Sequence, residues 1–127
     1  MKIIVRIILL LLLAKTGLAQ QKTVLGVPDF EKAIQTKNIQ LLDVRTPQEF
    51  ASGYIKGAVN ADWQNEKLFG EQVKKLDKAA PVYVYCLSGV RSANAADWLA
   101  ANGFKQIINL DGGIKAWKAA DKKVEIK

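Results

Sequence analysis

The chain contains a single cysteine, Cys86, which stands between an apolar run and a short glycine-containing loop. Residues 82–85 precede it, Gly89 and Arg91 follow it, and a helix-like stretch comes next. A strand, loop and helix in this order can turn several backbone N–H groups towards one point, and an arginine beside them adds positive charge. Such surroundings lower the pKa of a thiol and make it a nucleophile. The alternative is that Cys86 is a small, inert core residue.

If the thiol is reactive, the loop after it is the expected anion-binding site. Arginine in the first turn of a helix opposes the helix dipole, so a bound anion explains Arg91 better than a surface role does. Ser88 has two open interpretations, as a turn former or as a hydrogen-bond donor to the substrate. We expect Gly89 to adopt a positive φ, which lets the N–H groups face inwards. The predicted substrate-binding residues are Leu87, Ser88, Gly89, Val90, Arg91 and Ser92.

The residue inventory excludes several classes of chemistry. The chain has no histidine, which removes the Cys–His mechanism of thiol proteases and nearly every zinc site. A lone cysteine cannot form a structural disulfide within the chain. We therefore expect catalysis by Cys86 with no metal and no cofactor.

The first residues have the pattern of a secretory signal. Lys2 and Arg6 precede an apolar run at 7–14, and Gly17 and Ala19 supply small residues two apart. We predict a signal peptide at 1–19, cleaved after Ala19; the alternative is an uncleaved N-terminal anchor. The predicted protein is exported, periplasmic or secreted, with no stable membrane association after cleavage.

The remaining residues, 20–127, are predicted to form one domain. The whole chain has a formal net charge of +7, and loss of Lys2, Arg6 and Lys15 would leave +4. Basic residues are scattered rather than gathered into a stripe, so nucleic acid is not an expected partner. A mild positive balance helps to attract small anions.

Apolar runs and helical patterns alternate along this domain. Thr46 and Glu49 have the spacing of a capping box around Pro47, which starts a helix. The expected strands are 22–25, 39–44, 58–61, 82–85 and 106–110. The expected helices are 28–35, one starting at 46, 66–78, one from 91 to Asn102, and 114–119, with a fraying tail at 121–127. This alternation predicts an α/β fold with a central, mostly parallel sheet covered by helices on both faces, and Cys86 at the carboxyl end of a strand, where ligands bind.

Five segments, taken together, resemble a single-domain rhodanese, and they cover the chain from about 28 to 117. They are Leu42-Asp43-Val44-Arg45, Glu49-Phe50, Gly53-Tyr54-Ile55-Lys56-Gly57-Ala58, the Cys86-to-Arg91 loop and Leu110-Asp111-Gly112-Gly113-Ile114-Lys115-Ala116-Trp117. The resemblance implies a rhodanese-like three-layer sandwich and sulfurtransferase chemistry through a cysteine persulfide. The chain departs from the family pattern at two positions. Tyr54 stands where the family often has histidine, and the family often has proline near the position of Asp62. Asp43 and Arg45 are expected to pair with groups such as Glu49, although the resemblance also suggests that Arg45 faces the pocket.

The resemblance leads to a specific expected reaction. Cys86 takes sulfane sulfur from a small anionic donor, thiosulfate or a related compound, and passes it to cyanide or a thiol acceptor. Arg91 is the only cation of the loop, whereas some relatives that use thiosulfate carry a second basic residue there. The resemblance therefore implies sulfur transfer more directly than it implies thiosulfate as the donor.

Two other functions stay open. One is a persulfide carrier or binding module that serves a protein partner, which would need an exposed Cys86 and an apolar rim where an enzyme needs a pocket. The other is a cysteine phosphatase or arsenate reductase. It is disfavoured because four residues separate Cys86 from Arg91, where related phosphatases have five, and because there is no resolving cysteine.

Overall fold

The computed structural model describes residues 21–126, so the predicted signal peptide lies outside the described residues. The elements alternate as the sequence pattern indicates. In chain order they are β1 (Gln21–Leu25), α2 (Val27–Ala33), β2 (Gln40–Asp43), α3 (Pro47–Ala51), β3 (Val59–Asn60), α4 (Glu66–Val73), β4 (Val82–Tyr85), α5 (Val90–Ala101), β5 (Gln106–Leu110) and α6 (Gly113–Ala119).

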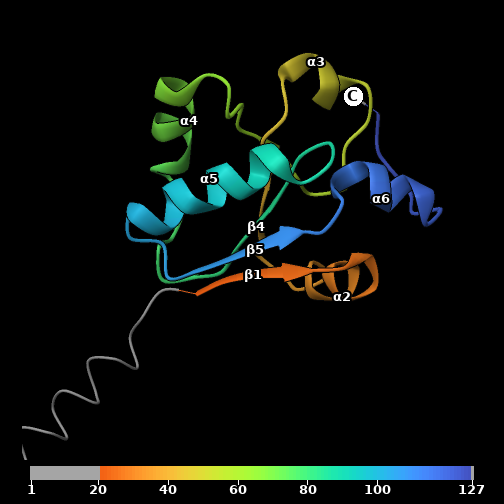
Figure 1. Ribbon diagram of the computed structural model, residues 1–127, viewed down its shortest axis with the longest axis horizontal. Helices are drawn as coiled ribbons and strands as arrows, with labels where there is room; N and C mark the ends of the chain where they lie inside the picture. The colour runs from red at the N-terminus through yellow and green to blue at the C-terminus, as the bar shows by residue number, and fades with distance from the viewer. Residues whose placement is uncertain (1–20, 127) are drawn as a thin grey trace, which may run out of the picture.

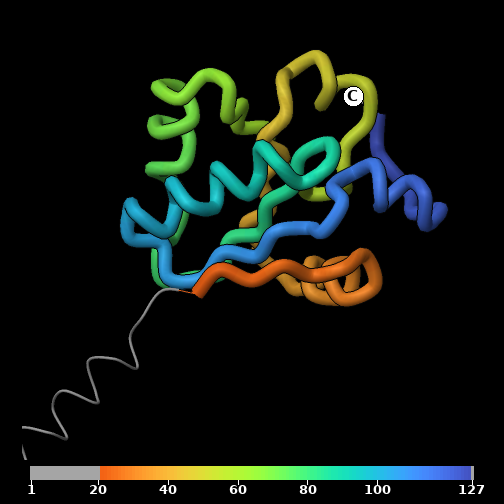
Figure 2. The backbone as a smooth tube through the Cα atoms, in the orientation of Figure 1, coloured from red at the N-terminus to blue at the C-terminus, as the bar shows by residue number. Residues whose placement is uncertain are grey.

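The strands form one five-stranded sheet in the order β1-β5-β4-β2-β3, and every neighbouring pair is parallel. The first strand therefore lies beside the last, as the red and blue segments of the backbone trace show (Figure 2). Helices surround this sheet (Figure 1). The predicted α/β class with a parallel sheet is confirmed.

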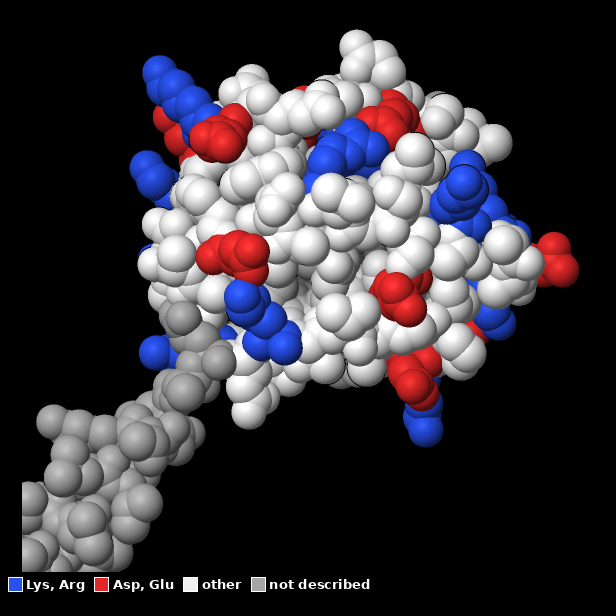
Figure 3. All heavy atoms as spheres, viewed as in Figure 1, with Lys and Arg blue, Asp and Glu red and all other residues white. Residues whose placement is uncertain are grey.

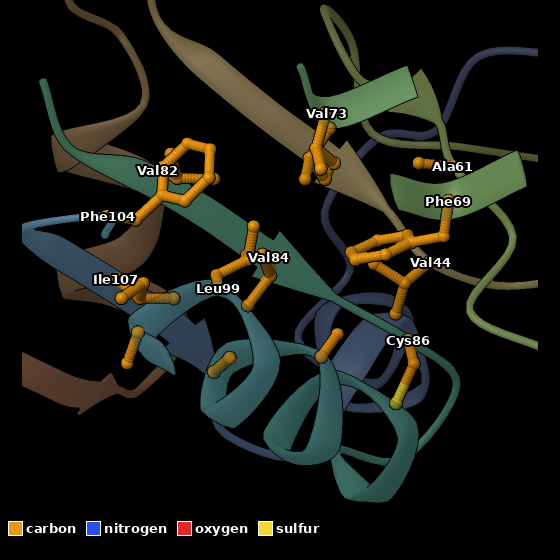
Figure 4. Close-up of a cluster of buried hydrophobic side chains, with 14 residues drawn as sticks. Val44, Ala61, Phe69, Val73, Val82, Val84, Cys86, Leu99, Phe104 and Ile107 are labelled. Atoms are coloured by element: carbon orange, nitrogen blue, oxygen red, sulfur yellow. The ribbon is translucent and has the colours of Figure 1, made fainter. Parts of the chain in front are cut away.

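Side chains of the central strand alternate between two separate cores. Val82 and Val84 pack with α4 and α5, whereas Tyr83 and Tyr85 lie with α2 and α6. This period of two arises because successive side chains of a strand point to opposite faces. The sheet is thus covered on both faces, which gives the predicted three layers. Cys86 lies at one edge of the first core, close to the start of α5 (Figure 4).

Two segments differ most from the sequence predictions. Helix α4 ends at Val73, not at Lys78, and the chain turns back with Leu76 N–H donating to the Val73 carbonyl. The turn is fixed from outside the helix, because the side chain of Gln40 accepts from Asp77 N–H at 2.7 Å. A contact from a distant strand therefore outweighs the local helical pattern.

The C-terminal tail is the second of these segments, and the prediction that it frays is wrong for the described residues. Tyr54 and Glu125 exchange two backbone hydrogen bonds of 2.9 and 2.8 Å in an antiparallel bridge. The indole of Trp117 donates to the Lys123 carbonyl at 3.0 Å, and Lys122 pairs with Glu31. Backbone pairing with a segment some seventy residues earlier holds the tail in place. No helix among residues 21–126 is both long enough and apolar enough to cross a bilayer.

Candidate active site

The sulfur of Cys86 lies inside a tight loop that joins the central strand β4 to α5. Gly89 has φ of +110°, and its N–H donates to Sγ of Cys86 at 3.0 Å. The hydroxyl of Ser92, a fully buried residue in the first turn of α5, lies 3.3 Å from the same sulfur. The structure thus places two of the predicted loop residues, Gly89 and Ser92, around the thiol, with the positive φ expected of Gly89.

Opposing effects act on the ionisation of this thiol. Burial of Cys86, which is 1% exposed, raises its pKa. Hydrogen bonds from the Ser92 hydroxyl and from the backbone N–H groups of Ser92, Gly89 and Ser88 lower it, and together they outweigh burial. The pKa of Cys86 is therefore below its ordinary value, which favours the nucleophilic thiolate.

Helix α6 holds the loop from the other side. The N–H of Ile114 donates to the Cys86 carbonyl at 2.9 Å, and that of Lys115 donates to the Leu87 carbonyl at 3.1 Å. A Cβ on Gly113 would lie 2.5 Å from both carbonyl oxygens, so a side chain there would push the loop away. Because α6 binds the loop carbonyls, the N–H groups remain free to face the sulfur.

Asn109, on β5, is a loop contact that sequence reasoning missed. Its side-chain amide donates to the Gly89 carbonyl at 3.4 Å, and the Ser92 hydroxyl lies 3.2 Å from the same carbonyl. Asn109 is only 7% exposed. The signal that could have revealed it is a lone polar side chain in the otherwise apolar run of residues 107–110.

Arg91 is bound to an acidic residue of the chain itself. Its guanidinium makes two hydrogen bonds to the Glu49 carboxylate, at 2.7 and 2.9 Å. Glu49 also completes the predicted capping box, accepting from the N–H and hydroxyl of Thr46. The Arg91 guanidinium outweighs partial burial and, with Thr46, lowers the pKa of Glu49 to about 2. The sequence predicts a bound substrate anion next to Arg91, whereas the structure places the Glu49 carboxylate there, and the pair ties α3 to α5.

Arg45 has a different set of partners. Its buried guanidinium pairs with Asp43 at 2.6 Å and donates to the Gly53 carbonyl, also at 2.6 Å. The guanidinium also lies over the Tyr85 ring, 5.8 Å from its centroid. The sequence predicted partners such as Glu49 for Asp43 and Arg45, but the two residues pair with each other. These hydrogen bonds secure the end of β2 instead of reaching the Cys86 loop.

The rim of the loop is exposed and mostly apolar. Leu87 is 44% exposed and Val90 is 69% exposed, and Ser88 is exposed between them. The Cys86 side chain itself is buried within the loop. The arrangement is a buried thiolate in a cradle of N–H groups, which suits a nucleophile that must hold a small anionic atom.

Comparisons with known proteins identify the family of the chain. The family model of the rhodanese-like domain matches residues 27–120. The thiosulfate sulfurtransferase GlpE of Shewanella oneidensis is 34% identical over 76% of this chain and 93% of its own length. The protein YqhL of Bacillus subtilis is 40% identical over 77% of this chain and 75% of its own length.

A solved structure shows the same fold. The rhodanese-like domain protein of Staphylococcus aureus superimposes with a TM-score of 0.70 at 32% identity, over 83% of this chain and 98% of that protein. The region that the family model matches contains the sheet from β2 to β5, the Cys86 loop and α6. The chain belongs to the rhodanese-like domain family.

Proposed function

We propose that this protein is a sulfurtransferase that carries sulfane sulfur on Cys86. The donor is thiosulfate or a related compound, and the acceptor is cyanide or a thiol. The observation that carries the proposal is the environment of the sulfur, which lies 3.0 Å from Gly89 N–H and 3.3 Å from the Ser92 hydroxyl at the carboxyl end of β4. The relatives named as sulfurtransferases support the same reaction class.

The reaction proceeds in two half-reactions. The Cys86 thiolate attacks the outer sulfur of thiosulfate, a new S–S bond forms, and sulfite leaves with the electron pair of the broken bond. The loop N–H groups then stabilise the anionic outer sulfur of the persulfide. In the second half-reaction the acceptor attacks that outer sulfur and restores the thiolate. No general base is needed, since the lowered pKa of Cys86 already favours the thiolate.

The carrier hypothesis has one specific observation in its favour. Leu87 and Val90 give the loop an exposed apolar rim that a protein acceptor can contact. The 1% exposure of Cys86 favours a small substrate instead, because the surface of a protein partner reaches a buried sulfur less easily. A phosphatase or arsenate reductase is less well supported, since the loop has four intervening residues and the chain has no second cysteine.

We also propose that the protein is exported, on the basis of the signal-like residues 1–19. The test is N-terminal sequencing of the protein from the periplasm and the medium. A mature chain that starts at Gln20 supports export, and an intact N-terminus in the cytoplasm contradicts it.

The enzymatic test is a thiosulfate–cyanide assay of the wild type and the Cys86→Ser variant. Serine occupies similar space but does not ionise at neutral pH, so thiocyanate formation should be lost while circular dichroism and urea unfolding change little. Wild-type turnover in Cys86→Ser would refute the proposal.

A further inference from the structure

The one cation of the active-site loop has its charge neutralised within the chain. Arg91 and Glu49 form a two-point ion pair, with side chains 22% and 30% exposed. Such a pairing holds both groups in a fixed geometry, because the planar guanidinium matches the carboxylate fork. Glu49 is held further by Thr46, so it cannot swing away freely.

This ion pair adjoins the loop that holds the reacting sulfur, because Arg91 lies in the first turn of α5 beside Ser92, whose hydroxyl is 3.3 Å from Sγ. The negative charge of Cys86 is one of the influences that raise the pKa of Arg91, after the larger effect of the Glu49 hydrogen bond. A donor that approaches Cys86 therefore meets a cation whose field is largely cancelled by Glu49. Basic and acidic side chains are also intermixed over the face in view, with a broad uncharged area between them (Figure 3).

The exposed side chains of the loop add to this low charge. Leu87 and Val90 are the exposed rim of the loop and carry apolar side chains. A small apolar group attached to the donor gains contact area there, whereas a fully hydrated dianion loses water without gaining a free cation.

We propose that Glu49 masks the charge of Arg91 and thereby tunes the Cys86 site to sulfane donors that carry one negative charge beside an apolar group, such as organic thiosulfonates, in preference to dianionic thiosulfate. This inference rests on the proposed sulfurtransferase function and specifies its donor class.

The two donors react by the same balanced step. The Cys86 thiolate bonds to the outer sulfur, and the donor's S–S bond breaks. The electron pair leaves with sulfite from thiosulfate or with the sulfinate from a thiosulfonate, and no proton moves. A thiosulfonate brings one negative charge to the thiolate, whereas thiosulfate brings two. Because Glu49 neutralises Arg91, that arginine does not offset the stronger repulsion between thiosulfate and the thiolate.

The test compares thiosulfate with methanethiosulfonate, in which a methyl group replaces one charged oxygen. The key variant is Glu49→Gln, whose amide oxygen can still accept the Thr46 hydrogen bonds of the capping box while the charge that neutralises Arg91 is lost. The matched control is Asp97→Asn. Asp97 lies in the second half of the same helix as Arg91, is 64% exposed and pairs with Lys22, so the variant changes the net charge equally without freeing Arg91.

The rate is followed by release of sulfite from thiosulfate and of sulfinate from methanethiosulfonate. For the wild type, kcat/KM should be higher with methanethiosulfonate than with thiosulfate. In Glu49→Gln, kcat/KM for thiosulfate should rise about tenfold and that for methanethiosulfonate about threefold, because an unmasked charge acts twice as strongly on a dianion. The gain should shrink at high salt. Asp97→Asn should leave the ratio of the two donors unchanged.

A second variant, Leu87→Lys, adds a cation to the rim and should move the ratio in the same direction even if Glu49→Gln loosens α3. A wild-type preference for thiosulfate, or an unchanged ratio in both Glu49→Gln and Leu87→Lys, would overturn the inference while leaving sulfur transfer intact. Failure of both donors to place sulfur on Cys86 would instead refute the proposed function itself.

Discussion

Replacement of Gly113 by alanine tests whether α6 keeps the Cys86 loop in its reactive shape. The added Cβ would lie 2.5 Å from the carbonyl oxygens of Cys86 and Leu87, so the loop would have to move by about 0.9 Å to reach an ordinary contact of 3.4 Å. The positive φ of +61° alone costs alanine about 1–2 kcal/mol. A shift of this size weakens the 3.0 Å bond from Gly89 N–H to the sulfur.

The functional cost follows from that hydrogen bond. A hydrogen bond to a charged group contributes about 1.5–3 kcal/mol, and roughly 1.4 kcal/mol corresponds to a factor of ten. Alkylation of Cys86 by iodoacetamide at neutral pH should therefore slow by about tenfold or more in Gly113→Ala, and its pH midpoint should move upwards.

Gly57→Ala is the matched control. Gly57 also has a positive φ, +89°, but no atom lies within 4 Å of the point where a Cβ would stand, so alanine there suffers backbone strain without a clash. It should lose only the backbone-strain part of the unfolding free energy, about 1–2 kcal/mol, and keep the wild-type alkylation profile. If Gly113→Ala also keeps that profile and the wild-type turnover, α6 does not set the reactivity of the thiol.

The remaining predictions concern Ser92 and Glu49. Ser92→Ala removes the hydroxyl 3.3 Å from the sulfur and should raise the pH midpoint of iodoacetamide alkylation; an unchanged midpoint would show that the hydroxyl does not stabilise the thiolate. The pKa of Glu49 is about 2 in the folded state and about 4.3 in an unfolded chain, so its ion pair stabilises the fold above about pH 4.3, and this contribution is lost as the pH falls towards 2. Urea unfolding between pH 6 and pH 2 should show a smaller acid loss in Glu49→Gln than in the wild type, and equal losses would count against the ion pair.

Local patterns in the sequence were sufficient for the order of the elements and for the position of Cys86. The alternation of Val82, Tyr83, Val84 and Tyr85 predicts a strand buried on both faces, and the capping box at Thr46 marks the start of α3. Both signals arise from neighbouring residues, so they can be read without knowledge of the fold.

The contacts that shape the site join distant segments, and spacing does not reveal them. Arg91 and Glu49 are 42 positions apart, and the sequence offered Arg45 as an equally suitable partner for Glu49. Gly113 lies against the carbonyls of Cys86 and Leu87, and this contact exists only because β5 pairs with β4. The local sequence allows several partners for each of these residues, and tertiary packing determines which contact forms.

The most direct test of persulfide formation is the intact mass of the protein after treatment with a sulfane donor and removal of the excess. Sulfur transfer through Cys86 predicts a gain of one sulfur atom, located on Cys86 by peptide mapping, removed by cyanide and absent from Cys86→Ser. Thiosulfate and methanethiosulfonate are used in parallel, so that donor preference does not hide the reaction. An unmodified Cys86 with both donors, or a sulfur that cyanide does not remove, would contradict the central claim that Cys86 is a persulfide-forming nucleophile.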